Sequence, residues 1–407
     1  MEDSERIPFA PPRIDQKVID EVVDTLRSGW ITTGPKTKAF EKAISDYCGS
    51  QRTLCLSAWT TAAELFLRWW GIGSGDEVII PSYTYCATAN IVLHCGARPV
   101  MVDVGPDYLM DMESIEKAIT ERTKIIMPVD VGGRPCDYEK LFEVVMRSDV
   151  TDKFRASNER QALLGRILIM ADAAHSFGAS RDSKMVGTLA DVTVFSFHAV
   201  KNLSTAEGGA ITFRLPNAFH MESIYRELNT LSLHGQSKDA LAKSQKGGWK
   251  YDVVVPGFKC NMTDIHASLG LVEIGRYPEN LAKRRSIYER YSEAFQTDER
   301  LETPLSVEES LSPSWHLYLL KIRDAEENQR DAVMARIDAA GVSVNVHFQP
   351  LPLLSAYKEL GYRIDDHPRA YDLYSRTISL PIFFDMTDSQ VDRVIQVVQE
   401  AVAIELG

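Results

Sequence analysis

Between residues 36 and 213, short apolar segments alternate with segments of helical spacing, and this alternation limits the possible folds more than any other feature. The apolar segments, rich in Val, Ile and Met, are 53–57, 76–82, 98–104, 123–129, 166–172, 192–197 and 209–213. The segments with helical spacing are 36–47, 60–70, 86–95 and 113–120. Short strands joined by helical crossovers predict an α/β fold with a mostly parallel sheet covered on both faces. Ligands bind such sheets beyond the carboxyl ends of the strands.

The pattern changes after about residue 257, where longer helical stretches replace the strand–helix alternation. Helical spacing is found at 262–296 and 329–340, and strand-like segments at 314–322 and 342–348. Near the end of the chain, Thr387 and Gln390 form a possible capping box before a helix. We therefore predict two domains: a large α/β domain over residues 1–257 and a smaller α+β domain over residues 258–407.

The charge balance argues against nucleic acid as a partner. The chain carries 45 Lys and Arg against 57 Asp and Glu, which gives a net charge of −12. Binding nucleic acid requires basic surface to neutralise phosphates. A few local cations or backbone N–H groups can still bind an anionic substrate. No apolar run approaches the ~20 residues that cross a bilayer, so we expect no membrane partner.

The cysteines and the N-terminal residues indicate the cellular compartment of the protein. The six cysteines have no C-x-x-C spacing and are Cys48, Cys55, Cys86, Cys95, Cys136 and Cys260. Dispersed thiols fit a reducing compartment better than a disulfide framework or a zinc site, so we predict no metal. Residues 1–16 lack the basic-then-apolar pattern of a secretory signal. We expect a cytoplasmic protein.

An acidic residue ends the segment "LIMAD", where the chain enters the small-residue turn "AAHSFGA". Asp172 is expensive to bury unless a cation or several donors pair with it. It either caps the next helix or points into the crevice at the strand ends. In the second case His175, one turn away, contacts the same ligand.

A lysine follows the neighbouring strand-like segment, in "FSFHAVKNLSTAEGG" (195–209). Taken alone, Lys201 is more typical of a solvated surface charge. Its position changes this interpretation, because Ser196 and Asp172 leave strand ends at the same edge of the sheet. A lysine in a dry crevice has a pKa below its usual value of about 10.4 and acts as a nucleophile toward carbonyls. Gly208 and Gly209 would allow another backbone segment to approach closely.

An amine, a carboxylate and hydroxyls at such an edge are the groups that pyridoxal phosphate requires. The lysine binds the cofactor covalently, and the acid keeps the pyridine nitrogen protonated. Hydroxyls and helix N-terminal N–H groups hold the phosphate. "SAWTTAAELFL" (57–67) opens a helix directly after a strand, with Thr60 and Thr61 as candidate phosphate donors. Simple N-capping explains this stretch equally well.

Five motifs in order along the chain resemble a known family. They are "SGWITTGPKTKAFE" (28–41), "GSGDEVIIPSYTYCATAN" (73–90), "DAAHSFGA" (172–179), "SFHAVKNLSTAEGG" (196–209) and "GFKCNMTDIHASLGLVEI" (257–274). Together they are similar to the sugar aminotransferases of the DegT/DnrJ/EryC1/StrS group, which have fold type I of the pyridoxal-phosphate enzymes. The resemblance implies a mostly parallel seven-stranded sheet and a homodimer with shared active sites.

The resemblance also implies a role for each matching residue. Lys201 matches the lysine that binds the cofactor covalently, and Asp172 matches the partner of the pyridine nitrogen. His175 matches the residue beside the ring hydroxyl. The remaining matches are Thr60 and Ser196 as phosphate ligands, Tyr85 stacked on the ring face, and Asn261 reaching the phosphate from the neighbouring subunit.

Three positions differ from the residues usual in the family. Trp59, in the cofactor's phosphate loop, replaces a glycine. Cys260 replaces a tyrosine, and Ala206 replaces a glycine before Glu207. None of these changes removes a group that the chemistry requires.

The implied reaction moves an amino group from L-glutamate to a keto sugar linked to a nucleotide, through pyridoxamine phosphate. Three segments look most like the branch that aminates C4 of UDP-linked 4-keto-6-deoxy sugars: "PGFKCNMTDI" (256–265), "VHFQPLPLLSAYKELGY" (346–362) and "SLPIFFDMTDSQ" (379–390). Candidates for binding the sugar nucleotide are Trp30, Thr32, His316 and His347. A structural role is at least as probable for His316, and the two roles are balanced for His347.

Other functions compete with this one. The chain could aminate C3 of a dTDP- or GDP-linked keto sugar, or bind pyridoxal phosphate as a non-catalytic regulator. A related dehydratase has a histidine in place of the lysine, and Lys201 argues against it. A lyase that uses Lys201 without a cofactor leaves Asp172 and the phosphate ligands unexplained.

Overall fold

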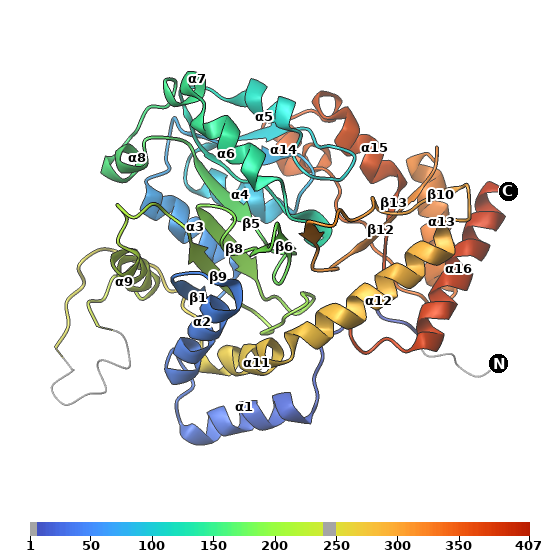
Figure 1. The fold of residues 1–407 in the computed structure, drawn as a ribbon, viewed down its shortest axis with the longest axis horizontal. Coiled ribbons are helices and arrows are strands. Elements are labelled where there is room, and N and C mark those ends of the chain that lie inside the picture. The colour runs from blue at the N-terminus through green and yellow to red at the C-terminus, as the bar shows by residue number, and fades with distance from the viewer. Residues whose placement is uncertain (1–5, 239–249) are drawn as a thin grey trace.

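A seven-stranded sheet forms the centre of the molecule in the computed structural model, which describes residues 6–238 and 250–407 (Figure 1). Its strands are β1 (Thr53–Leu56), β2 (Glu77–Pro81), β3 (Arg98–Val102), β4 (Thr123–Ile126), β5 (Leu168–Asp172), β8 (Val192–Ser196) and β9 (Gly209–Phe213). They are ordered β1-β9-β8-β5-β4-β2-β3, and β9 alone in this sheet runs antiparallel to its neighbours. The predicted α/β fold with a mostly parallel seven-stranded sheet is therefore confirmed.

Helices cover both faces of this sheet, as the strand pattern predicts. They are α2 (Pro35–Cys48), α3 (Trp59–Trp70), α4 (Cys86–His94), α5 (Met112–Ala118), α6 (Tyr138–Met146), α7 (Ser148–Thr151), α8 (Glu159–Leu164) and α9 (Met221–Ser232). A 3₁₀ turn, η1 (Val131–Gly133), follows β4. Two further helices, α1 (Gln16–Ser28) and α11 (Asp264–Gly275), pack against each other, and α11 also packs against α2.

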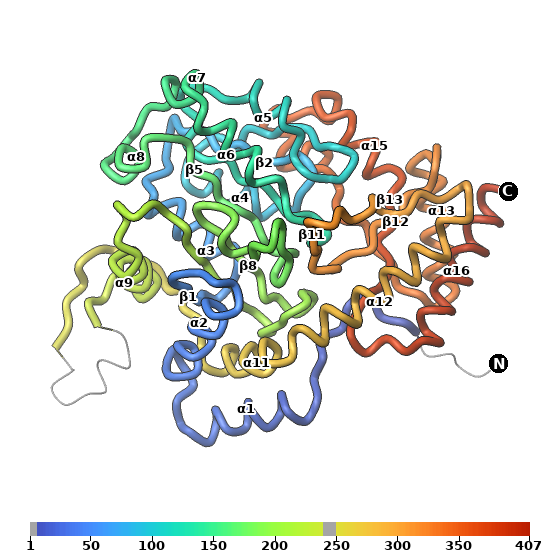
Figure 2. The backbone as a smooth tube through the Cα atoms, in the orientation of Figure 1, coloured from blue at the N-terminus to red at the C-terminus, as the bar shows by residue number. Residues whose placement is uncertain are grey.

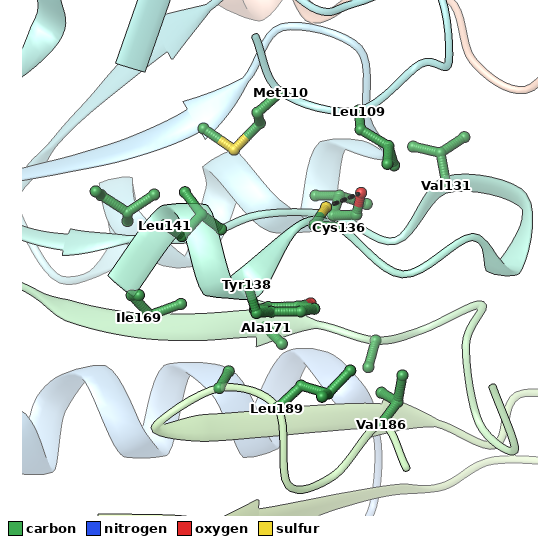
Figure 3. Packing of buried hydrophobic residues seen from close by; sticks show 14 of the residues in the cluster. Leu109, Met110, Val131, Cys136, Tyr138, Leu141, Ile169, Ala171, Val186 and Leu189 are labelled. Atoms are coloured by element: carbon green, nitrogen blue, oxygen red, sulfur yellow. Dashed lines mark hydrogen bonds between the residues drawn. The ribbon is translucent and has the colours of Figure 1, made fainter. Parts of the chain in front are cut away.

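The side chains of β5 show how the two faces are divided. Ile169 and Ala171 belong to one buried apolar cluster, and Figure 3 shows them packed toward Tyr138 and Leu141 of α6. Leu168 and Met170 belong to the second cluster, together with residues of α3 and α4. Successive side chains of a strand point to opposite faces. Asp172 therefore ends β5 on the face that α3 and α4 cover.

A smaller unit follows the central sheet, with its own apolar cluster. The helices in this part of the chain are α12 (Tyr277–Phe295), α13 (Glu327–Ala339), α14 (Ser355–Glu359), α15 (Pro368–Arg376) and α16 (Asp388–Leu406), with 3₁₀ turns η2 (Leu351–Leu353) and η3 (Ile364–Asp366). Of these, η2, α14 and α15 pack their buried apolar residues into the clusters of the large unit. Its sheet contains β10 (Leu301–Glu302), β12 (Tyr318–Ile322) and β13 (Thr377–Leu380). Three short strands, β6 (Ser180–Arg181), β7 (Lys184–Met185) and β11 (Leu311–Ser312), join the two units.

The N-terminal segment contacts the small unit before the chain enters the large one. Ile7 pairs with Val342 and belongs to the apolar cluster of the small unit. The backbone then runs to α1, which lies beside α11 at the foot of Figure 2. The predicted boundary between residues 257 and 258 stays a prediction. Packing groups α11 with helices of the large unit, and the small unit's cluster starts, in this part of the chain, within α12.

Two segments differ from the sequence prediction. The helix predicted over 262–296 is divided at Arg276, because Pro278 lacks the N–H and crowds the carbonyl four residues earlier. The predicted strand over 314–322 starts only at Tyr318. Its first part binds the η1 turn instead, through hydrogen bonds from the N–H of Ser314 to Gly133 O and from the N–H of His316 to Gly132 O (3.0 and 3.1 Å).

The segment 342–348 also forms no regular strand. It makes isolated bridges at Val342 and Asn345, and its second half lines a cavity described below. The predicted capping box is confirmed at the start of α16. There the N–H of Gln390 donates to Thr387 Oγ1 (3.2 Å), and the N–H of Thr387 donates to Gln390 Oε1 (3.0 Å). Among the described residues, no helix combines the length and apolar character needed to span a membrane.

The two glycines that follow the lysine loop allow close packing. A Cβ on Gly209 would lie 2.5 Å from the backbone N of Trp59 and 2.5 Å from the carbonyl carbon of Ala58. A Cβ on Gly208 would lie 2.1 Å from Thr205 Oγ1. Gly209 thus lets β9 lie directly against the N-terminus of α3.

We predict that Gly209→Ala lowers the free energy of unfolding by about 1–3 kcal/mol, because backbone atoms that cannot move away block the added methyl group. Gly73→Ala is the matched control, since nothing lies within 4 Å of its Cβ position. It should change stability by less than about 0.5 kcal/mol. Urea denaturation of both variants measures the difference, and equal effects would contradict the packing account.

Candidate active site

A cavity of about 500 Å³ lies beyond the carboxyl ends of β5 and β8, where the sequence predicts a site. The N-termini of α3 and α4 and the loop after β8 form most of its wall. Residues 345–348 of the small unit close another side. The lining includes seven residues predicted from the sequence, namely Thr60, Trp59, Tyr85, Asp172, His175, Ser196 and Lys201, and one candidate sugar-binding residue, His347.

Asp172 is a buried carboxyl group held by two donors. The hydroxyl of Thr88 donates to Oδ2 (2.8 Å), and the N–H of Ala174 donates to Oδ1 (3.2 Å). Burial raises the pKa of Asp172 to about 7, and these two hydrogen bonds and the charge of Lys201 oppose the rise. The carboxyl group therefore gains or loses a proton near neutral pH.

Lys201 lies in the loop after β8, on the cavity wall. Its N–H donates to His198 O (2.9 Å), which fixes the backbone of the turn. Burial lowers the pKa of the Lys201 amine to about 8, while the charge of Asp172 acts in the opposite direction. No hydrogen bond or ion pair to its Nζ is found within residues 6–238 and 250–407. The amine is therefore available to a ligand in the cavity, and it is not a solvated surface charge.

The N-terminus of α3 faces the cavity. Thr61 Oγ1 accepts from the N–H of Ala58 (3.1 Å) and donates to Ala58 O (3.0 Å), so Thr61 caps the helix. Thr60 and Ser196, which both carry a hydroxyl, line the same cavity. First-turn N–H groups and the helix dipole favour negative charge at this position. Of the two threonines that the sequence offers, the structure places Thr60 in the lining.

Trp59 takes the place of the glycine usual in the family without leaving the helix. Residue 58 is extended, and Trp59 is the first residue of α3. The buried indole donates from Nε1 to Val194 O (3.1 Å), and the same carbonyl accepts from the N–H of Ala173 (2.9 Å). Trp59 thus ties the N-terminus of α3 to the strand that ends at Ser196.

His175 is oriented by the η1 turn. Its Nδ1 accepts from the N–H of Gly132 (3.2 Å), so the proton of the neutral imidazole is on Nε2. Burial lowers the pKa of His175 well below its usual value, which keeps the ring neutral. Its ring also stacks on Phe348 (5.6 Å between centroids, 18° between planes). His175 can therefore donate one hydrogen bond into the cavity.

Tyr85 and His347 lie on the outer part of the lining. Tyr85 is the N-cap residue of α4, and 62% of its surface is exposed, so one ring face is open to a ligand. His347 Nδ1 is 2.9 Å from Ser379 Oγ, and its carbonyl accepts from the hydroxyl of Tyr83 (2.6 Å). Burial lowers the pKa of His347 to about 4, so this imidazole is neutral at physiological pH.

The remaining predicted residues do not line this cavity. His316 is buried behind His175, with ring centroids 4.4 Å apart. Trp30, Thr32 and Asn261 lie together elsewhere. Asn261 Nδ2 donates to Thr33 Oγ1 (2.5 Å), and Trp30 Nε1 donates to Thr33 O (3.1 Å). The carbonyl of Thr32 accepts from the N–H at the start of α11.

The sequence interpretation did not identify several lining residues. Thr88, which donates to Asp172, is the clearest case. It lies one helical turn after Thr84, and the two hydroxyls are 3.0 Å apart. This i, i+4 pair of threonines near a strand end was a signal in the sequence. His198, Glu207, Asn345 and Phe348 also line the cavity, and no spacing in the sequence indicates them.

These groups fit pyridoxal phosphate. A partly buried amine with no protein partner among the described residues and a buried carboxyl group lie on one cavity, which the N-terminus of α3 and the hydroxyls of Thr60 and Ser196 also line. The cavity volume is in the range of small-molecule and cofactor sites. In residues 6–238 and 250–407, no three His, Cys, Asp or Glu side chains form a group that could hold a metal ion.

Comparisons with known proteins agree with this arrangement. The DegT/DnrJ/EryC1/StrS aminotransferase family matches residues 12–152 and 158–399. The spore coat polysaccharide biosynthesis protein SpsC of Bacillus subtilis (strain 168) is 36% identical over 401 residues, which cover 97% of each chain. Spr1654 from Streptococcus pneumoniae, which is assigned as a sugar aminotransferase, is 46% identical in its PMP form, with a TM-score of 0.94 over 98% of this chain and 100% of that chain.

Two further structures are similar along their whole length. The PLP form of Spr1654 has a TM-score of 0.93 and 44% identity, covering 99% of this chain and 100% of that chain. The aminotransferase TlmJ from Streptoalloteichus hindustanus has a TM-score of 0.84 and 27% identity, covering 98% of this chain and 100% of that chain.

The fold and the cavity define an aminotransferase that uses pyridoxal phosphate. The chain belongs to the DegT/DnrJ/EryC1/StrS aminotransferase family. The predictions of family, fold and cofactor are thereby confirmed.

We predict that Thr88→Val weakens cofactor binding at and below neutral pH. The hydroxyl of Thr88 stabilises the charged form of Asp172, so its loss raises the pKa of Asp172 above about 7. The pH below which cofactor affinity is lost, which is the acid limb of the affinity profile, should then rise by roughly one unit. Thr88→Ser keeps the hydroxyl and should retain the wild-type limb. Fluorescence titration of the cofactor-free proteins measures both, and an unchanged limb in Thr88→Val would contradict this role.

Proposed function

We propose that the protein moves the amino group of L-glutamate to C4 of a UDP-linked 4-keto-6-deoxy sugar, for the synthesis of a cell-surface polysaccharide or glycan. The observation that carries this proposal is the amine of Lys201, which has no partner among the described residues and lies on the same cavity as the buried carboxyl group of Asp172. SpsC, a full-length relative, is named for polysaccharide biosynthesis. The free cysteines suit the cytoplasm as the site of the reaction.

The roles of the side chains follow from their positions. Pyridoxal phosphate supplies a carbonyl for the lysine and a ring that withdraws electrons from the reacting carbon. Lys201 would hold the group covalently, and an amino donor would free its amine. Its freed amine is then neutral, and it takes the proton from the donor Cα as a general base. In the second half-reaction, the same amine returns a proton to the sugar carbon that receives nitrogen.

The other lining residues set the protonation state of the cofactor ring and bind its hydroxyl and phosphate groups. Asp172 keeps a proton on the pyridine nitrogen, and Thr88 stabilises the carboxylate form that this requires. His175 donates from Nε2 to the ring hydroxyl. Thr60, Ser196 and the N-terminus of α3 bind the phosphate.

We further propose a homodimer whose active sites are shared. Glutamate and a sugar nucleotide are anions, yet no arginine is among the described residues that line the cavity. The imidazoles of His175 and His347 are neutral and supply no positive charge. Lys201 binds the cofactor and so does not bind the anionic groups of a substrate. A second copy can supply the missing donors through Asn261, which lies outside the cavity of its own chain.

Exposed apolar side chains support this assembly. They lie on and beside α1 and in the segment 250–258, and they are Ile14, Ile19, Leu26, Ile31, Tyr251, Val253, Val254, Val255 and Phe258. Large apolar residues exposed in this number are typical of surfaces that another protein covers. Lys259 donates a hydrogen bond to Asn261. The positive charge of Lys259 therefore lies beside the Asn261 amide.

The substrate is tested with L-glutamate and a panel of UDP-, dTDP- and GDP-linked 4-keto-6-deoxy sugars, with the products read by mass. We expect the UDP-linked sugar to give an amino sugar, and Lys201→Ala to give none. Preference for a dTDP- or GDP-linked sugar would favour the alternative nucleotide. A visible cofactor band that glutamate fails to bleach, with no product from any sugar, would favour a non-catalytic regulator.

The shared site is tested by co-expressing Lys201→Ala with Asn261→Asp, each inactive when present alone. Asn261→Asp keeps the side-chain shape but brings a negative charge toward the phosphate. In a shared arrangement each hybrid dimer contains one intact site, so statistical mixing should restore about a quarter of wild-type activity. No recovery from hybrid dimers isolated with two tags would contradict shared sites.

A further inference from the structure

Behind the cavity wall lies a group of buried polar side chains to which the proposed reaction assigns no role. We call it the Asn202 network, and its members are Asn202, Asn280, Arg284, Ser314 and His316, all less than 9% exposed. Buried polar groups are retained only when hydrogen bonds satisfy them. Asn202 directly follows Lys201, so the network begins beside the reactive amine.

The hydrogen bond from Asn202 to Ser314 fixes the direction of the hydrogen bond between His316 and Asn202. Asn202 Nδ2 donates to Ser314 O (2.7 Å), which leaves Oδ1 of the same amide as an acceptor. His316 Nδ1 lies 2.8 Å from this Oδ1 and must therefore carry the proton. Burial lowers the pKa of His316 well below its usual value, so the ring is neutral and its Nε2 carries no proton.

The backbone of Asn202 is fixed as well as its side chain. Asn280 Nδ2 donates to Asn202 O (2.8 Å). Arg284 Nε donates to Asn280 Oδ1 (2.9 Å), and Arg284 Nη1 donates to Ile382 O (3.0 Å) and to His316 O (3.4 Å). Three contacts thus hold Asn202, and they connect the loop of Lys201 to α12 and to the small unit.

His316 also supports His175. Their ring centroids are 4.4 Å apart. The N–H of His316 donates to Gly132 O (3.1 Å), and the N–H of the same Gly132 donates to His175 Nδ1 (3.2 Å). One glycine of the η1 turn therefore positions both imidazoles.

Arg284 gives this network an unusual charge. Within the described chain, its hydrogen-bond acceptors are neutral oxygens, and it forms no ion pair with a carboxylate there. An uncompensated buried cation is unfavourable for folding. Its position beside His316 opposes protonation of that ring.

We propose that His316 is a positioning residue that sets the place of the Lys201 amine through Asn202 and the orientation of His175 through ring contact. This role rests on the proposed function of the site but is measurable without substrate. Loss of the donor at His316 would leave a buried Asn202 Oδ1 unsatisfied, which loosens the loop of Lys201 and admits water. The amine would then behave more like an ordinary lysine.

The test compares two isosteric variants, His316→Asn and His316→Leu. The Asn variant can place an amide N–H where His316 Nδ1 lies, and the Leu variant cannot. In the cofactor-free proteins, salicylaldehyde is allowed to react with Lys201 over a range of pH, and the product is trapped with borohydride and measured by mass. We expect half-maximal reaction near pH 8 for the wild type and for His316→Asn. For His316→Leu we expect a shift upward by at least about half a pH unit.

A second readout uses the cofactor-loaded proteins. Turnover with the accepted sugar should fall roughly tenfold in His316→Leu and recover in part in His316→Asn. His367→Leu is the stability control, because His367 is buried and lies outside the cavity lining and the Asn202 network. It should leave the aldehyde profile unchanged.

Identical aldehyde profiles for the wild type, His316→Leu and His316→Asn would overturn the proposal. An upward shift of equal size in both variants would overturn the part that runs through Asn202. Should His316→Leu not fold, His316→Phe is measured by the same criterion, since it keeps a ring and lacks the donor. Failure of every sugar in the panel would leave the aldehyde result intact, so the two proposals fail separately.

Discussion

Removal of water from two opposite charges is the constraint on which the rest of the site depends. In the cavity, burial raises the pKa of the Asp172 carboxyl to about 7 and lowers that of the Lys201 amine to about 8. Each charge partly stabilises the other, so neither group is held permanently in one state. The parallel pairing of β5 with β8, which sets Asp172 opposite Val194, brings both groups to one edge of the sheet.

Hydrogen bonds around the cavity fix the elements that carry its lining residues. Asp130 is fully buried after β4 and accepts from Ser176 Oγ (2.6 Å) and from the Tyr138 hydroxyl (2.9 Å), which fixes the start of the η1 turn. The turn then orients His175 through Gly132. At the other end, the indole of Trp59 ties the α3 N-terminus to β8. These hydrogen bonds hold the elements that carry the cavity lining in place.

Local patterns were enough to predict the parts of the site that strand ends define. Asp172, Ser196 and Lys201 follow apolar strands, and parallel topology alone brings such ends together. The remainder depends on tertiary packing. The spacing of Thr84 and Thr88 marks a pair of hydroxyls near a strand end but does not show that Thr88 faces Asp172. Nothing local indicates that the stretch around His316 binds the η1 turn instead of extending β12. The residues predicted to bind sugar were the least well predicted: His347 lines the cavity, whereas His316 is buried behind His175 and Trp30 and Thr32 lie elsewhere.

The most direct test of this account locates the covalent bond to the cofactor. The protein is mixed with pyridoxal phosphate, reduced with borohydride, digested and mapped by mass spectrometry. The account predicts a single phosphopyridoxyl group, carried by the peptide that contains Lys201. A label on a different lysine, or no label after reduction of a protein that retains its fold, would contradict it.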